Sequence, residues 1–288
     1  MKVIKAIILM FVCFEVMASE PFMRHPLDNM PIMERLPKDR YGSNAPVEQR
    51  DIEHRKFLSP SVKIKVANGS GSGTIIHYDE KQNLAYVASC GHLWKGGVVN
   101  WEEAEKKNIT CKVLTWYKND EKLKSPEEFE ARLLFYSYTD DVDTSLIVFS
   151  PNWMPKYFPI APLDYKYKFN SVAHSCGCDG GREVAHYEVT ILELGEDLIT
   201  VKNSPRPGRS GGGLFDEKFY IGTCWGTQYI DGSGIGFFTP IREIHEFWSK
   251  QKKYDFLVRG AEVKARSIPI KDRNDSKKEY SYDYIIVP

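Results

Sequence analysis

The chain has 288 residues, 42% of them hydrophobic, which suffices for one or two globular domains with a substantial apolar core. Its 39 basic residues balance its 39 acidic residues, so no net charge attracts nucleic acid or an anionic membrane surface. The composition therefore argues against a nucleic-acid-binding protein, and we expect no nucleic-acid partner.

The first eighteen residues have the layout of a cleavable export signal. Lys2 and Lys5 precede an apolar run from Ala6 to Phe14, and the segment ends with Val16 to Ala18. No later segment reaches the roughly 20 apolar residues that a membrane-spanning helix needs. We therefore expect residues 1–18 to be removed, and the mature protein to be secreted or periplasmic without insertion into a membrane.

Removal of this signal leaves an odd number of cysteines, which cannot all pair. The five are Cys90, Cys111, Cys176, Cys178 and Cys224. An oxidising compartment permits disulfides, but their connectivity cannot be deduced from the sequence. We therefore predict no specific disulfide.

Residues 19–56 predict an extended arm or pro-segment, because they carry five prolines and no sustained apolar period. From residue 62 onward, short apolar runs alternate with a period of two, which is typical of strands joined by turns. The predicted strands cover 62–66, 74–77, 84–89, 109–117, 129–136, 146–149, 184–194, 198–202 and 214–225. The last of them contains a hairpin tip at Asp216 to Lys218.

Two segments have helical character. Residues 125–131 form a polar segment that fits either a helix or the start of a strand. Residues 241–252 predict a helix, with Thr239 as N-cap and Pro240 as first helical residue. Many short strands followed by one helix predict an all-β barrel or sandwich, and we expect 255–288 to be a polar tail.

The segment Gly208 to Gly213 reads Gly-Arg-Ser-Gly-Gly-Gly and precedes a predicted strand. Glycines on both sides of Ser210 allow a tight loop that presents its hydroxyl outward. In such a loop the N–H groups of Gly208 and Ser210 point together and can form an oxyanion hole. The alternative is a flexible glycine-rich turn between two strands.

A serine nucleophile needs a base, and the base needs a carboxylate to orient it. His92 directly follows an apolar strand, which places it at a strand end. Asp143 adjoins the next buried strand, whereas Asp140 and Asp141 look like solvated turn acids. We therefore expect His92 as general base and Asp143 as its orienting acid.

The order His92, Asp143, Ser210, each in its own local setting, resembles the chymotrypsin/trypsin-like serine peptidases, especially bacterial members related to periplasmic heat-shock proteases. Four further segments are similar to family strands in the same order: 71–76, 143–147, 222–226 and 235–240. The resemblance covers roughly Val62 to Trp248. It implies two antiparallel β-barrels at 57–150 and 151–254, the second ending in a short C-terminal helix, with the active site between them.

By this resemblance, the protein is a serine endopeptidase that forms an acyl-enzyme on Ser210 and needs no cofactor or metal. Its partner would be a polypeptide substrate. The resemblance also implies a substrate-binding set of Ser204, Cys224, Trp225, Gly226 and Gly236. None of these is charged, so we expect an uncharged side chain on the substrate residue before the cleaved bond.

One departure from the family concerns Arg209. Many members place an aspartate there, which pairs with a newly released N-terminus. We therefore expect no activation by N-terminal insertion, and an oxyanion loop held by local packing that includes Pro205 and Pro207.

Three alternatives remain at the level of sequence. The first is a secreted binding protein that kept the fold without turnover, and the second is an esterase with the same triad. The third is a structural zinc bound by His174, Cys176 and Cys178 with a fourth ligand, although a small turn explains these residues equally well.

Overall fold

The computed structural model describes residues 54–94, 97–119, 121–139, 142–195, 198–202, 208–230 and 233–258. The predicted signal peptide, nearly all of the predicted arm and most of the polar tail lie outside these residues. The same is true of Ser204, Pro205 and Pro207. No helix in the described ranges is long and apolar enough to span a membrane.

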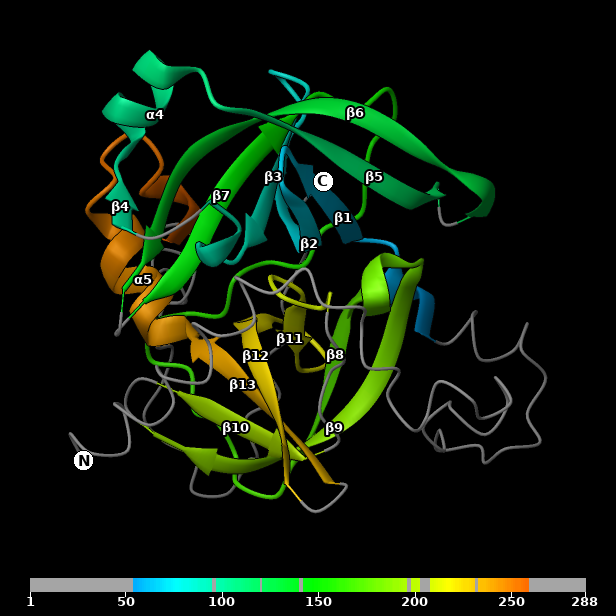
Figure 1. Ribbon diagram of the computed structural model, residues 1–288, viewed down its shortest axis with the longest axis vertical. Coiled ribbons are helices and arrows are strands. Elements are labelled where there is room, and N and C mark those ends of the chain that lie inside the picture. Colours follow the sequence, from blue (N-terminus) through cyan, green and yellow to red (C-terminus); the bar gives the residue numbers. More distant parts are fainter. Residues whose placement is uncertain are drawn as a thin grey trace, which may run out of the picture. The chain divides into compact units, whose positions relative to one another are not determined.

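Seven antiparallel strands form the first half of the structure (Figure 1). They are β1 (Ser61–Val66), β2 (Gly69–Asp79), β3 (Leu84–Ser89), β4 (Gly97–Val99), β5 (Thr110–Lys118), β6 (Glu121–Tyr138) and β7 (Asp143–Phe149). The order is β4-β6-β5-β1-β2-β3-β7, and pairing of β6 with β7 closes a six-stranded barrel, with β4 attached to its side. On strands with one face in solvent, residues alternate between the barrel interior and solvent, whereas every residue of β7 is buried. In β1, for example, Val62 and Ile64 are buried whereas Lys65 is exposed.

Six further antiparallel strands form a second closed barrel. They are β8 (Val172–Cys178), β9 (Val184–Leu194), β10 (Ile199–Lys202), β11 (Gly213–Phe215), β12 (Tyr220–Ile230) and β13 (Ser233–Pro240). Their order is β10-β13-β12-β11-β8-β9. The prediction of two antiparallel barrels with a short C-terminal helix is confirmed.

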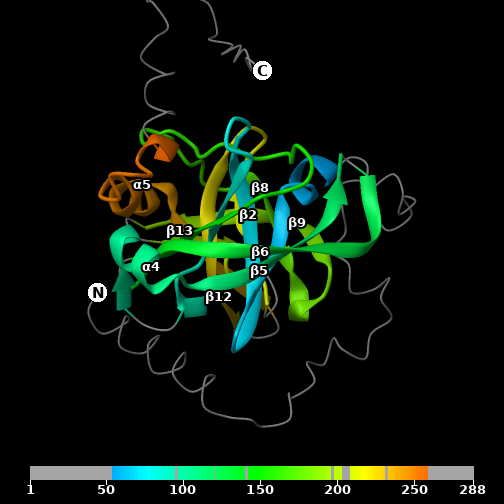
Figure 2. The ribbon, with the colours of Figure 1, turned by 90° about the horizontal axis from the view of Figure 1, so that it is seen from above.

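The C-terminal helix α5 (Ile241–Ser249) lies at the junction of the two barrels (Figure 1). Trp248 is fully buried on its inner face, and its indole N–H donates to Thr144 Oγ1 of β7 at 3.3 Å. Helix α4 (Trp101–Lys107) lies on the same side of the molecule (Figure 2), where the N–H of Trp101 donates to Gln251 just beyond α5. One hydrophobic cluster joins the interior of barrel two to the outer face of barrel-one strands, whereas the interior of barrel one forms a second, separate cluster.

The polar segment 125–131 is strand, not helix. It lies within β6 and pairs with β5 as an antiparallel hairpin, with Phe129 opposite Val113. Cross-strand packing of this kind outweighs the weak helical preference of a polar run. A second difference concerns β8, part of which sequence reasoning interpreted as a small turn. Its residues show no apolar alternation, and all but the first are buried.

Helix α5 begins where it was predicted, but its cap is different. Pro240 is the N-cap residue, and Thr239 makes no capping bond. The Thr239 hydroxyl donates instead to the backbone carbonyl of Asp143 at 3.1 Å. The side chain that was expected to start the helix therefore joins β13 to the start of β7.

Candidate active site

The loop that carries His92 follows strand β3 and has no room for a side chain at Gly91. A Cβ atom added at Gly91 would lie 1.9 Å from the carbonyl oxygen of Ser137 in β6. Glycine therefore lets this loop pack flat against β6. His92 then opens a short 3₁₀ helix (His92–Trp94), with its side chain 25% exposed.

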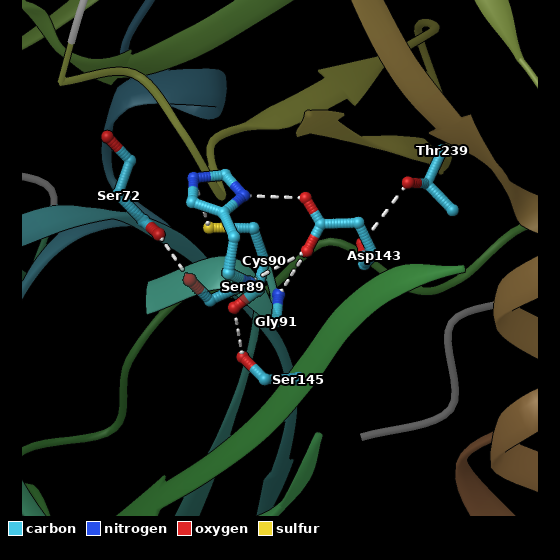
Figure 3. A network of polar contacts seen from close by, with 8 residues as sticks. Ser72, Ser89, Cys90, Gly91, Asp143, Ser145 and Thr239 are labelled. Atoms are coloured by element: carbon cyan, nitrogen blue, oxygen red, sulfur yellow. Dashed lines mark hydrogen bonds and ion pairs between the residues drawn. The ribbon is translucent and has the colours of Figure 1, made fainter. Parts of the chain in front are cut away.

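Asp143 begins β7 and binds this loop through both carboxylate oxygens (Figure 3). Its Oδ1 accepts hydrogen bonds from the N–H of Gly91 at 2.5 Å and of His92 at 2.9 Å. Its Oδ2 lies 2.6 Å from His92 Nδ1, and the carboxylate is only 2% exposed. This arrangement favours the imidazole tautomer with the proton on Nδ1, which leaves Nε2 as the basic nitrogen.

The basic nitrogen of His92 lies against a buried thiol. Cys90 Sγ is 3.5 Å from His92 Nε2, and Cys90 has no exposed surface. Burial raises the pKa of the Cys90 thiol, so the thiol stays protonated at neutral pH. Burial alone would lower the pKa of His92, but the Asp143 carboxylate beside Nδ1 raises it above its ordinary value. The site therefore stabilises the imidazolium that forms when His92 takes up a proton.

The loop around Ser210 has a backbone that only glycine can adopt on either side of the serine. Gly208 and Gly211 have φ angles of +93° and +84°, in the left-handed region. A Cβ atom on Gly208 would lie 2.6 Å from the carbonyl oxygen of Cys178, and one on Gly211 would lie 2.3 Å from that of Ser72. Glycine at these two positions therefore permits the left-handed backbone of the loop and its close packing against the backbone of Cys178 and Ser72.

The Ser210 loop and the His92 loop are in contact. A Cβ atom on Gly211 would lie 2.9 Å from the backbone nitrogen of Cys90, two residues before His92. The N–H of Ser72, in strand β2, donates to the carbonyl of Ser210 at 2.7 Å. Barrel one therefore both supplies the His92–Asp143 pair and holds the backbone of Ser210.

Two observations concern the groups that catalysis would use. Among the described residues, no hydrogen bond joins His92 to Ser210, and the nearest recorded neighbour of Nε2 is Cys90. In the same ranges, no group accepts a hydrogen bond from the N–H of Gly208 or of Ser210.

The predicted substrate-binding residues that the structure describes lie in β12 and β13. Thr227 pairs with Gly236, and Gly226 pairs with Phe237 next to it. Trp225 sits at the bulge between Cys224 and Gly226. A Cβ atom on Gly226 would meet nothing within 4 Å, so the space beside it is open.

Cys224 is placed differently from these neighbours. Its side chain is buried, its N–H donates to the carbonyl of Gly212 and its carbonyl accepts from the N–H of Gly211, both at 2.8 Å. Cys224 therefore holds the Ser210 loop from the side of β12. All five cysteines of the described residues, Cys90, Cys111, Cys176, Cys178 and Cys224, are buried free thiols.

The zinc alternative is not supported by the arrangement of the described residues. Their only group of three potential ligands within 4.8 Å of one another is Cys90, His92 and Asp143. His174 points elsewhere: its Nδ1 lies 2.9 Å from His186 Nε2 and its Nε2 lies 3.2 Å from Glu217 Oε1. The His174, Cys176 and Cys178 trio forms no such group.

Sequence reasoning missed two side chains that bond to the Ser210 loop. Ser72 Oγ donates to the carbonyl of Gly208 at 3.0 Å, and Arg209 Nε donates to Asp179 Oδ1 at 2.8 Å. Arg209 is fully buried. The sequence shows that Arg209 is an unusual neighbour of Ser210. Neither its contact with Asp179 nor that of Ser72 with Gly208 can be inferred from spacing along the chain.

Comparison with known proteins gives the fold its context. No protein-family model matches the sequence, and no curated protein sequence does. The Rv3671c protease of M. tuberculosis, in an inactive form, is similar in structure, with a TM-score of 0.50 and 20% identity, over 72% of this chain and 95% of that chain. The serine endoprotease from Yersinia pestis gives a TM-score of 0.53 and 16% identity, over 73% and 68% of the two chains. Deg5 gives a TM-score of 0.52 and 15% identity, over 72% and 96%. The fold is therefore the two-barrel, trypsin-like one that the resemblance implied.

Proposed function

We propose that this protein is a serine-type endopeptidase that acts on polypeptide substrates through Ser210, His92 and Asp143. The observation that carries the proposal is the His92–Asp143 pair, with Nδ1 and Oδ2 2.6 Å apart, in a loop that packs against the glycine-flanked Ser210. The trypsin-like fold supports it, since this fold brings these two loops together at the junction of the barrels. The export-signal layout of residues 1–18 leads us to propose a secreted or periplasmic enzyme.

In the proposed reaction, His92 Nε2 takes the hydroxyl proton of Ser210 while Oγ attacks the carbonyl carbon of the peptide bond. The N–H groups of Gly208 and Ser210 stabilise the resulting oxyanion. As the C–N bond breaks, His92 returns the proton to the leaving amine, which leaves an acyl-enzyme on Ser210. Water then attacks the ester in the same way, with His92 as base, and releases the carboxylic acid product.

We further propose that the substrate chain lies along β12 near Trp225 and Gly226, where its backbone adds a strand to the sheet. The open space beside Gly226 leaves room for a substrate side chain. Trp225, Gly226 and Gly236 bring no charge to this region, so an uncharged side chain is expected before the cleaved bond. Peptide-library profiling tests this, and a strict preference for Arg or Lys would contradict it.

One observation favours the alternative of a binding protein without turnover. His92 Nε2 lies 3.5 Å from Cys90 Sγ, and no described hydrogen bond joins it to Ser210. Catalytic hydrogen bonds are often long in ligand-free enzymes and shorten when substrate binds, so we favour the peptidase. A single labelling experiment separates the two.

A fluorophosphonate probe reacts with a serine hydroxyl only where a base and an oxyanion hole activate it. We expect stoichiometric labelling of the purified protein that disappears in both Ser210→Ala and His92→Ala. Ser249→Ala, which changes an exposed serine at the end of α5, is the control and should label like the unchanged protein. A folded protein that stays unlabelled would instead support the binding protein.

A further inference from the structure

The residue before Ser210 is a fully buried cation, which is unusual enough to require an explanation. Arg209 has 0% exposure, and a buried charge is costly unless it is paired and hydrogen-bonded. Its Nη2 finds no acceptor among the described residues, so this cost is not completely offset. A hydrophobic side chain of similar volume would avoid the cost, which suggests that Arg209 serves something other than stability.

The partners of Arg209 all belong to the β8–β9 hairpin. Its Nε donates to Asp179 Oδ1 at 2.8 Å, and its Nη1 donates to the carbonyl of Ser175 at 2.9 Å. The guanidinium lies 4.2 Å from the centre of the Tyr187 ring, and the Tyr187 hydroxyl donates to the second oxygen of Asp179. Arg209 thus joins the nucleophile loop to a part of barrel two that is distant in the chain.

The backbone of the loop is held at the same place. The turn that carries Asp179 packs directly under Gly208, since a Cβ atom there would lie 2.8 Å from the nitrogen of Gly181. Ser72 donates to the carbonyls on both sides of Arg209, from Oγ to Gly208 at 3.0 Å and from N–H to Ser210 at 2.7 Å. Because Ser72 holds both carbonyls and the ion pair holds the Arg209 side chain, the loop has little freedom to rotate.

We propose that Arg209 and Asp179 are positioning residues: their buried ion pair holds the Ser210 loop with its Gly208 and Ser210 amides ready to bind an oxyanion. This inference rests on the proposed peptidase function. The pair lies within the folded chain, so holding the loop in this way needs no newly released N-terminus. Neither residue touches the substrate, and the pair acts through the backbone geometry of the loop.

The first variant is Asp179→Asn, which removes the counter-charge while keeping the shape of the side chain. We expect kcat to fall by about 100-fold, as when an oxyanion-hole donor is lost, with KM changed little. Asp179 lies outside the His92–Asp143 pair, so the pH dependence of kcat/KM on its acid side should not move. Glu183→Gln is the control, because it breaks the exposed Lys122–Glu183 ion pair of the same region and should leave kcat unchanged.

The double variant Arg209→Met/Asp179→Asn separates the effect of the ion pair on loop geometry, read from kcat, from its effect on stability, read from the melting temperature. Removing both charges should recover the melting temperature that Asp179→Asn alone loses, because no uncompensated charge stays buried. Positioning requires kcat to remain about 100-fold low, since methionine makes none of the directional bonds of arginine. Recovery of kcat together with the melting temperature would overturn the proposal.

A readout that needs no turnover completes the test. Amide hydrogen exchange of peptides covering 208–212 should become at least about 10-fold faster in Asp179→Asn and stay unchanged in Glu183→Gln. If the unchanged protein neither labels nor hydrolyses peptides, the proposed function fails while this measurement still decides whether the ion pair fixes the loop. If the protein is active but Asp179→Asn keeps normal kcat and normal exchange, the positioning role fails and the peptidase stands.

Discussion

Among single residues, the Asp143 carboxylate acts on His92 in two ways, and the substitution Asp143→Asn tests both. It orients the imidazole of His92 and raises its pKa, although burial of the ring opposes that rise. Because neutral imidazole is the base in the proposed reaction, kcat/KM should increase as the pH rises through the pKa of His92.

Asp143→Asn should therefore lower the pKa of His92 and shift the acid side of the kcat/KM profile to lower pH. It should also reduce kcat by about 10⁴-fold, because the amide no longer favours the required tautomer. Titration of the His92 ring by NMR and a peptidase assay measure the two effects. Asp164→Asn, at an exposed position, is the control, and near-normal turnover in Asp143→Asn would refute the choice of acid.

The packing of the His92 loop against β6 depends on the absence of a side chain at Gly91. Gly91→Ala places a methyl group 1.9 Å from the carbonyl oxygen of Ser137, so strand β6 or the His92 loop must move. We expect a loss of about 1–3 kcal/mol in the free energy of unfolding, together with reduced turnover as the N–H of Gly91 is displaced from Asp143. Urea denaturation measures the first effect. Gly69→Ala is the control because its added Cβ meets nothing within 4 Å, and equal stability of the two variants would contradict the argument.

At the scale of elements, a helical turn at 54–58 docks onto barrel two through stacked rings. Phe57 lies 4.1 Å from the ring of His174 and 5.4 Å from that of His186, measured between centroids. Burial lowers the pKa of His174, although Glu217 opposes the shift. Burial, helped by His54 and His174, lowers the pKa of His186 well below its ordinary value. Both rings are therefore neutral in the folded protein at neutral pH.

This cluster predicts a loss of stability in mild acid. The unfolded histidines titrate near pH 6.5 and the folded ones lower, so the unfolded state binds more protons as the pH falls below about 6.5. The stability that neutral histidines provide is complete above that pH and is lost progressively below it. His186→Phe should reduce the slope of unfolding free energy against pH between pH 7 and 5, whereas Glu193→Gln on the same strand should not. An unchanged slope in His186→Phe would exclude this cluster as the cause.

The two neighbouring strands β8 and β9 also show what a sequence reveals about an element. Strand β9 was predictable because apolar residues such as Val189 and Ile191 recur at every second position and face the interior. Strand β8 was not, since Cys176, Gly177 and Cys178 are small residues buried on both faces, which removes the alternation. Periodicity finds a strand that separates core from solvent and misses one that is buried on both sides.

At the scale of the whole molecule, the resemblance predicted the order of the barrels and the contact of His92 with Asp143, because each residue stood at the end of a recognisable strand. The features that hold the Ser210 loop could not be predicted. Ser72 lies between glycines in β2 and has no sequence signal of its own, and Arg209 meets Asp179 only because the β8–β9 hairpin folds under the loop. Such contacts depend on how strands close into a barrel, which the spacing of residues along the chain does not encode.

Ser72 makes the link between the barrels testable, since this one side chain of barrel one bonds to two backbone groups of barrel two. Its Oγ donates to the carbonyl of Gly208 and accepts from the N–H of Cys178 at 2.8 Å. Ser72→Ala leaves both buried groups unpaired, so we expect the free energy of unfolding to fall by about 1–3 kcal/mol. Turnover should fall by about 10- to 100-fold, because the backbone at Gly208 is then no longer held at its carbonyl and its N–H can move away from the oxyanion. Ser61→Ala, which removes a buried hydroxyl bonded to the carbonyl of Phe57, should lower stability alone. If both variants lose stability and neither loses turnover, barrel one does not control the nucleophile loop through this serine.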